Sequence, residues 1–265
     1  MAGNDRADRA RQWANLLGAV FQILAAFLLP VAQAASGNPT PVDPAGYAFA
    51  IWGLIYLLAL VYAVYQAFPS RRTNPLFRRV GWFTAGAFIL CGLWEVVVPL
   101  GQLLLAQVIL VGIFLCAGVA YARLVSSERA VVGRTARWLV GLPTAMLFGW
   151  VTAANAVSLT SEAARLGLVS GGIAEAVLGA ALLLAGGVIA SVVIRIGRAG
   201  PPQPYVTYGL AVLWALVAVV VSQFDSSVLG AASALLAGAV VARALLVALR
   251  GRGGGAGTIP NTEVA

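Results

Sequence analysis

Three acidic residues lie within or beside long apolar stretches of this sequence, at Glu95, Glu175 and Asp225. An ionisable residue inside a membrane segment is costly and usually belongs to a ligand site or a proton pathway. If Glu95 and Glu175 face one cavity, they favour proton-coupled transport. If they reach the outer face of the membrane, they are only hydrated side chains. Both interpretations stay open for Glu95, and hydration is favoured for Asp225.

Residues suited to metal or nucleophilic chemistry are scarce. Histidine is absent, which removes the most common general base and the most common ligand of haem and metals. No serine or cysteine has a base at catalytic spacing, so we predict no enzymatic activity, no catalytic residue, no metal site and no cofactor. Cys91 and Cys116 fall at depths that differ by roughly 8 Å, at about 1.5 Å per helical residue. Because a disulfide requires closer Cα atoms, we predict two free, buried thiols.

Aromatic residues are concentrated at the start of the second apolar stretch, at Tyr47, Phe49, Trp52 and Tyr56. Trp52 and Tyr56 are four residues apart and therefore share one face of a helix. Such a stripe most often reflects packing, and the alternative is a stacking surface for a ligand. The surrounding sequence is needed to choose between the two.

The elements that carry these residues are predicted to be membrane helices. Hydrophobic residues make up 61% of the 265 residues, 10% are charged and the mean hydropathy is +0.92, which excludes a soluble globular domain. Apolar runs of roughly 17 to 25 residues, the length that crosses a bilayer, predict an all-α polytopic bundle of about eight transmembrane helices. The predicted spans are 13–35, 46–68, 80–100, 102–124, 136–159, 168–196, 205–224 and 227–249.

The basic residues, all of them arginines, indicate the orientation of the bundle. Sixteen of the 17 fall on one side of the predicted spans and only Arg165 on the other, which predicts cytoplasmic N and C termini in a multi-pass protein of the cell membrane. They form no patch interleaved with aromatic residues, so we expect no nucleic-acid partner. Trp13, Trp82 and Trp138 are expected to form an interfacial belt at the cytoplasmic side, and Trp214 to lie in the core.

The segments outside the spans carry further expectations. Residues 1–12 are predicted to be a cytoplasmic N-terminus, and residues 250–265 a disordered cytoplasmic tail. The proline-rich loop 36–44 is predicted to be a stiff outer cap. An alternative stays open at the N-terminus, because its arginines, its apolar run and Ala32-Gln33-Ala34 resemble a signal peptide. Cleavage there would leave seven spans.

The second predicted span resembles a helix of the TspO/MBR family, the translocator proteins and tryptophan-rich sensory proteins. The resemblance rests on Pro44 at its start, on the aromatic Tyr47, and on the stretch Ile51-Trp52-Gly53-Leu54-Ile55-Tyr56. It is the most specific of three matching stretches.

Two later stretches match the same family in part. Leu90 and Trp94 keep the leucine and tryptophan of its Leu-Asn-x-x-Trp motif, with Cys91 in place of the asparagine. Pro143 and Asn155 keep the twelve-residue spacing found in its fifth helix. The residues that depart from the fifth-helix pattern are Thr144 for tyrosine, Leu147 for tryptophan and Ala154 for leucine, with Trp150 nearby.

The resemblance covers residues 13–159 and implies a five-helix bundle there. The three further transmembrane helices predicted over 160–249 have no counterpart in this five-helix family, and they are either a divergent extension or the mark of a separate lineage. It implies an aromatic pocket in the outer half, beneath the proline-rich loop, in a sensor, receptor or carrier for a flat hydrophobic ligand such as a tetrapyrrole, a sterol or an isoprenoid. The alternative is a secondary transporter of a small molecule that uses Glu95 and Glu175. The expected partners are the lipid bilayer and the hydrophobic ligand, and a homodimer stays open. The candidate ligand-binding residues are Tyr47, Phe49, Trp52, Tyr56, Trp94, Glu95, Trp150 and Asn155.

Overall fold

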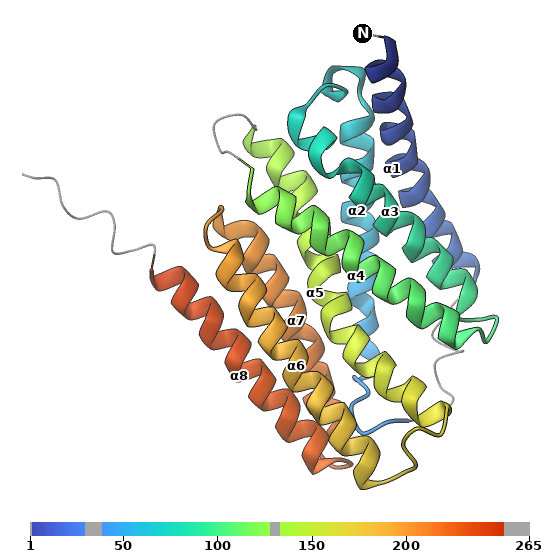
Figure 1. Cartoon of the computed structure of the whole chain (residues 1–265), viewed down its shortest axis with the longest axis vertical. Helices are drawn as coiled ribbons and strands as arrows, with labels where there is room; N and C mark the ends of the chain where they lie inside the picture. The colour runs from blue at the N-terminus through green and yellow to red at the C-terminus, as the bar shows by residue number, and fades with distance from the viewer. Residues whose placement is uncertain (1, 30–38, 128–132, 252–265) are drawn as a thin grey trace, which may run out of the picture.

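The structure, a computed structural model, describes residues 2–29, 39–127 and 133–251. Within these ranges the chain forms eight α-helices, two short 3-10 turns and no strand (Figure 1). The expected all-α bundle is therefore confirmed. The helices are α1 Ala2–Leu28, α2 Ile51–Ala67, α3 Pro75–Val97, α4 Leu103–Val125, α5 Arg134–Arg165, α6 Ile173–Gly197, α7 Pro202–Gln223 and α8 Val228–Arg250, with the turns η2 Gly46–Ala50 and η3 Pro69–Arg71.

In the described ranges, seven of the helices, α2 to α8, are long and apolar enough to cross a membrane. The first turns of α1 are charged, and the span predicted over 13–35 extends into residues outside the described ranges. The other predicted spans match their helices to within a few residues, except that α5 continues beyond Leu159 to Arg165. In this extra turn and a half, the Thr160 hydroxyl donates to the Ala156 carbonyl, and Arg165 pairs with Glu162 at 2.8 Å.

The outside of the bundle is apolar, as a lipid-facing surface requires. Leu104, Val108 and Leu115, along one side of α4, are each more than half exposed. The chain is therefore a multi-pass membrane protein in contact with a lipid bilayer. The tryptophans expected in an interfacial belt also point outward, and these are Trp13, Trp82 and Trp138.

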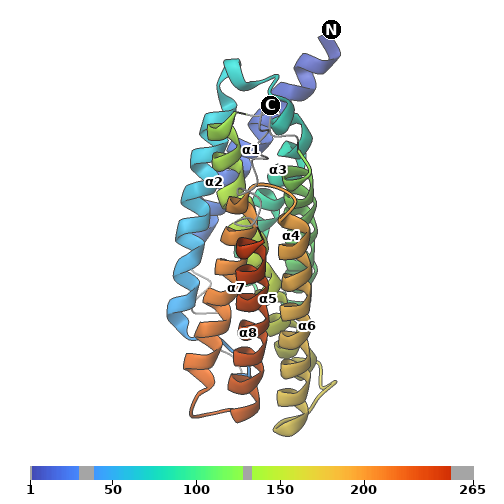
Figure 2. The ribbon, with the colours of Figure 1, turned by 90° about the vertical axis from the view of Figure 1, so that its left-hand side faces the viewer.

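α5 is the centre of the bundle. It packs against α2, α4, α6 and α7, whereas α1 and α3 lie on one flank and α8 on the other (Figure 1). Figure 2 shows the helices running side by side along the long axis, with the start of α1 at the top of the view and α8 rising from the bottom. Buried residues from all eight helices join in one hydrophobic core. The last three helices are thus packed directly onto the first five.

A short segment before η2 also attaches the first part of the chain to the last three helices. We call residues 39–45 the strap. The Ala45 amide donates to the Ala218 carbonyl at 2.9 Å, and the Gln223 side chain donates to the Asp43 carbonyl at 3.0 Å. Val42 is fully buried, and its methyl groups lie against Gly179 of α6. We expected the proline-rich loop to cover the outer aromatic residues, but its described part is bound to α6, α7 and α8.

Three predictions fall on residues outside the described ranges and stay predictions. They concern the first residues of the proline-rich loop, 36–38, the signal-peptide site at 32–34 and the tail, of which only 250–251 are described. The cysteines are both free, as predicted. Cys91 is fully buried, whereas Cys116 is only partly buried, because its position on α4 is nearer the lipid-facing side.

The arginine asymmetry gives a first testable prediction, about orientation. The exposed residue Thr73 lies between η3 and α3, and the exposed Ser226 lies between α7 and α8, at the opposite end of the bundle. We expect an impermeant thiol reagent applied outside intact cells to label Ser226→Cys and to leave Thr73→Cys unlabelled. Labelling of Thr73→Cys alone would mean that the bundle has the reverse orientation.

Candidate ligand-binding site

Five aromatic side chains from four elements meet near the strap end of the bundle, and we call them the aromatic cluster. Trp52 of α2 is at its centre and stacks on Trp94 of α3, with ring centroids 5.8 Å apart and planes inclined by 29°. Its ring also lies 5.3 Å from Tyr56 and 6.0 Å, edge to face, from Trp150 of α5. Phe49 of η2 approaches Trp150 edge to face at 5.8 Å.

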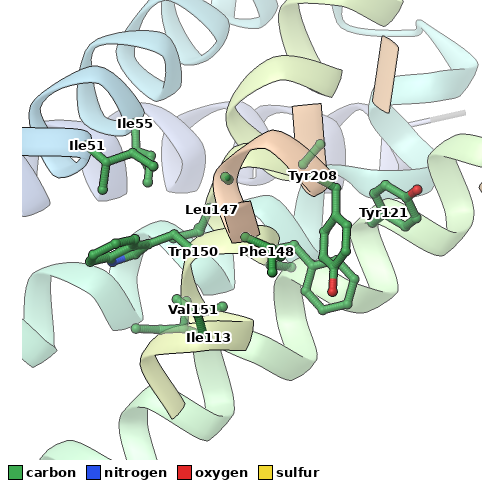
Figure 3. Close-up of a cluster of buried hydrophobic side chains, with 14 of the residues drawn as sticks. Ile51, Ile55, Ile113, Tyr121, Leu147, Phe148, Trp150, Val151 and Tyr208 are labelled. Carbon is green, nitrogen blue, oxygen red and sulfur yellow. The ribbon is translucent and has the colours of Figure 1, made fainter. Parts of the chain in front are cut away.

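Local structure explains why these rings converge. The four-residue spacing of Trp52 and Tyr56 places both on the face of α2 that is turned toward the bundle. Trp94 lies in the last turn of α3, and Trp150 lies halfway along the central helix α5. Figure 3 shows Trp150 beside Leu147 on the side of α5 toward Ile51 and Ile55. Leu147 and Trp150 are both buried.

A carboxyl group lies next to the aromatic rings. Glu95 is 4% exposed, and the Tyr56 hydroxyl donates a hydrogen bond to its Oε1. No other hydrogen bond to this carboxyl, and no ion pair, is found among the described residues. The cluster therefore combines π surfaces with one buried acidic group.

A second polar atom of the cluster is the Trp150 indole Nε1, which is buried and has no hydrogen-bond partner. A buried N–H without an acceptor costs roughly 1 to 3 kcal/mol. It is therefore a donor that an acceptor group on a ligand, or a water molecule, would satisfy. Apart from these two groups, the cluster consists of aromatic rings packed on one another between η2, α2, α3 and α5.

Two of the predicted site residues lie elsewhere. Tyr47 is nearly half exposed and contacts Trp214 of α7 edge to face at 5.5 Å. Asn155 accepts a hydrogen bond from Gln107 of α4 at 3.0 Å, as a link between helices. The prediction that Trp214 lies in the core was wrong, since it is 41% exposed. Its indole donates to the Ala48 carbonyl at 3.0 Å, and this bond holds the residue at the surface beside η2.

The other candidate acids do not join Glu95. Glu175, in the first turn of α6, accepts a hydrogen bond from the Gly171 amide at 2.9 Å and so closes its own loop. Asp225 is exposed in the turn between α7 and α8, in agreement with hydration. The two carboxyls that suggested a shared cavity, Glu95 and Glu175, thus have separate partners on separate elements.

Sequence reasoning missed a second aromatic group, on the side of α5 that faces α4 and α7. The Phe148 and Tyr208 rings lie 4.9 Å apart, and Tyr121 lies 5.6 Å from Phe148 (Figure 3). The hydroxyls of Tyr208 and Thr152 are 3.0 Å apart. The four-residue spacing of Phe148 and Thr152 was the available signal, but it did not reveal which helices would face it.

Comparisons with known proteins add a family assignment. A sequence model of the family described as TSPO-like protein matches residues 13–249. The match starts within α1 and ends at the close of α8, so it includes the last three helices. No curated protein and no solved structure matches the chain.

Proposed function

The chain belongs to the TSPO-like protein family, and on this premise we propose that its aromatic cluster binds a flat hydrophobic ligand, of tetrapyrrole, sterol or isoprenoid type. The protein would act as a membrane sensor or carrier, without catalysis.

The observation that carries this proposal is the contact of Trp52, Trp94 and Trp150 from three different helices. Packing between membrane helices is normally achieved with small residues, because lipid is as apolar as the protein interior. An indole, Trp52, that contacts two further indoles from other helices is therefore an unusual way to fill space, and the three rings offer large flat surfaces. A ligand that inserts between them would exchange ring–ring contacts for ring–ligand contacts of similar strength.

The structure also offers a polar anchor and an entrance. The unpartnered Nε1 of Trp150 would donate to a carbonyl, hydroxyl or carboxylate oxygen of the ligand. Phe49, which covers the edge of Trp150, is 41% exposed and belongs to a short 3-10 turn, so its displacement would open the cluster from the strap end.

We expect Trp52→Leu and Trp94→Leu each to weaken the binding of metal-free porphyrin by about three- to tenfold. The reason is that each aromatic pair contributes roughly 0.5 to 1.5 kcal/mol beyond area burial, and about 1.4 kcal/mol is a factor of ten. The measurement is quenching of tryptophan fluorescence in detergent, with a sterol as the second ligand.

Trp82→Leu is the matched control, because Trp82 is half exposed on α3 at the opposite end from the cluster and should not alter binding. If all three variants are folded by circular dichroism and bind the porphyrin equally well, the cluster is structural packing and the site lies elsewhere.

One observation favours the second candidate function, a secondary transporter of a small molecule. Glu95 is a membrane-buried carboxyl that accepts a hydrogen bond from Tyr56, and ionisable residues inside membrane segments often mark ion or proton pathways. Glu175 gives no support to this second function, because its carboxylate accepts a hydrogen bond from the Gly171 amide in the loop before α6.

A further inference from the structure

Two buried acids near opposite ends of the bundle, Asp8 and Glu95, differ in the partners of their carboxyl groups. On α1, Asp8 is 6% exposed, and it is paired with the guanidinium groups of Arg78 and Arg11. On α3, Glu95 is equally buried, and its hydrogen-bond partner is the neutral hydroxyl of Tyr56. A buried carboxylate normally has a cation beside it. Glu95 thus resembles one half of an ion pair.

Among the residues that the structure describes, no basic side chain is paired with Glu95. At the strap end, the only arginine among the described residues is Arg165, and it already pairs with Glu162 at 2.8 Å. The acidic residues at this end are Asp43, Glu95, Glu162, Glu175 and Asp225. Such an excess of negative charge attracts cations to this end and repels anions.

The aromatic rings beside Glu95 are also suited to positive charge. The face of an aromatic ring is electronegative, and among the aromatic side chains tryptophan attracts cations most strongly. Trp52 and Trp94 present nearly parallel faces, Trp150 closes a third side, and Tyr56 connects the rings to the carboxyl through its hydroxyl. An apolar cation between these rings would gain stacking, cation–π attraction and an ion pair with Glu95, whereas a neutral ligand would gain stacking alone.

We propose that the aromatic cluster selects hydrophobic organic cations, with the positive charge beside Glu95 and the apolar body between Trp52 and Trp94. This inference rests on the proposed function, because it specifies the ligand class of the same site. Glu95 is a binding residue here, and Tyr56 orients its carboxyl.

The test uses two probes of nearly equal size and shape, the tetraphenylphosphonium cation and the tetraphenylborate anion. The full-length protein in a neutral detergent is titrated with each, and binding is measured by calorimetry and tryptophan quenching. We expect the cation to bind at least about tenfold more tightly than the anion. Glu95→Gln should weaken binding of the cation about tenfold and leave that of the anion unchanged or stronger.

Glu175→Gln is the matched control, since it removes the same charge at the same end but outside the cluster. It should retain most of the preference for the cation. If Glu95→Gln does not fold, Tyr56→Phe replaces it; this variant removes the hydrogen bond that orients the Glu95 carboxyl and should reduce the preference for the cation. Equal binding of the two probes by the wild-type protein would overturn the inference, as would cation binding that Glu95→Gln leaves intact.

These outcomes separate the inference from the proposed function. If metal-free porphyrin binds in a manner that requires Trp52 and Trp94, but the phosphonium has no advantage over the borate, only the selectivity for cations fails. In the opposite case, binding of the phosphonium depends on Glu95, but porphyrin binding is insensitive to replacement of either tryptophan. The cation site is then supported, and the proposal of a tetrapyrrole or sterol ligand is refuted.

Discussion

Replacing Asp8 by asparagine should lower the free energy of unfolding by about 3 kcal/mol, because the change leaves a buried guanidinium without its counter-charge. Arg11 is 1% exposed, and Asp8 is its ion-pair partner at 3.4 Å. The same carboxylate receives the Arg78 guanidinium from α3, so it joins the first turns of α1 to α3. Thermal or denaturant unfolding of the purified protein in detergent measures the change.

A dependence on pH should accompany this effect. Hydrogen bonds from Arg78, with smaller contributions from the charges of Arg78 and Arg11, hold the pKa of Asp8 below its usual value, against the opposing effect of burial. The stabilisation is therefore fully present above the ordinary aspartate pKa of about 3.9 and is lost as the pH falls through the lowered folded-state value. The free energy of unfolding of Asp8→Asn should therefore lack this fall at low pH.

Asp5→Asn is the control, because Asp5 pairs with Arg9 and Arg72 in an exposed position on the same helix. Exposed pairs contribute little, so this variant should unfold nearly as the wild type does. If both variants lower the free energy of unfolding equally, the overall charge of α1 provides the stability, and the buried ion pairs of Asp8 with Arg11 and Arg78 do not.

Gly149→Ala should lower the free energy of unfolding by about 2 kcal/mol, although alanine is the better helix former. A Cβ at this position would lie 2.3 Å from the Tyr208 carbonyl oxygen and 2.9 Å from the Ala211 Cβ. Both contacts lie on α7, and a backbone atom cannot rotate away as a side chain can. The central helix and α7 would have to separate, and the unfolding midpoint in detergent should fall.

Gly186→Ala provides the comparison, since the nearest atom to its added Cβ is the Thr152 carbonyl oxygen at 3.9 Å. The free energy of unfolding of this variant should equal that of the wild type or exceed it by about 0.5 to 1 kcal/mol. If Gly149→Ala unfolds at the same midpoint as Gly186→Ala, the close approach of α5 and α7 is not what attaches the last three helices.

Several features of the molecule could be predicted from the sequence alone, because each depends on a local property of the chain. The number and length of the helices follow from apolar runs long enough to cross a bilayer, and most ends were correct to within a few residues. The contact between Trp52 and Tyr56 follows from their four-residue spacing. Six of the eight candidate ligand-binding residues lie together in the structure, and their role in binding stays a prediction; they are Phe49, Trp52, Tyr56, Trp94, Glu95 and Trp150.

Only the tertiary structure decided which faces meet. It brought Glu95 to Tyr56, Tyr47 to Trp214 and the strap to α7, and it separated Glu175 and Asn155 from the cluster. The physical reason is that lipid and protein interior are both apolar, so the buried and the exposed faces of a membrane helix have similar compositions. On α4, Ile113 is fully buried whereas Leu104 and Val108 face outward, and no pattern of hydrophobicity distinguishes them.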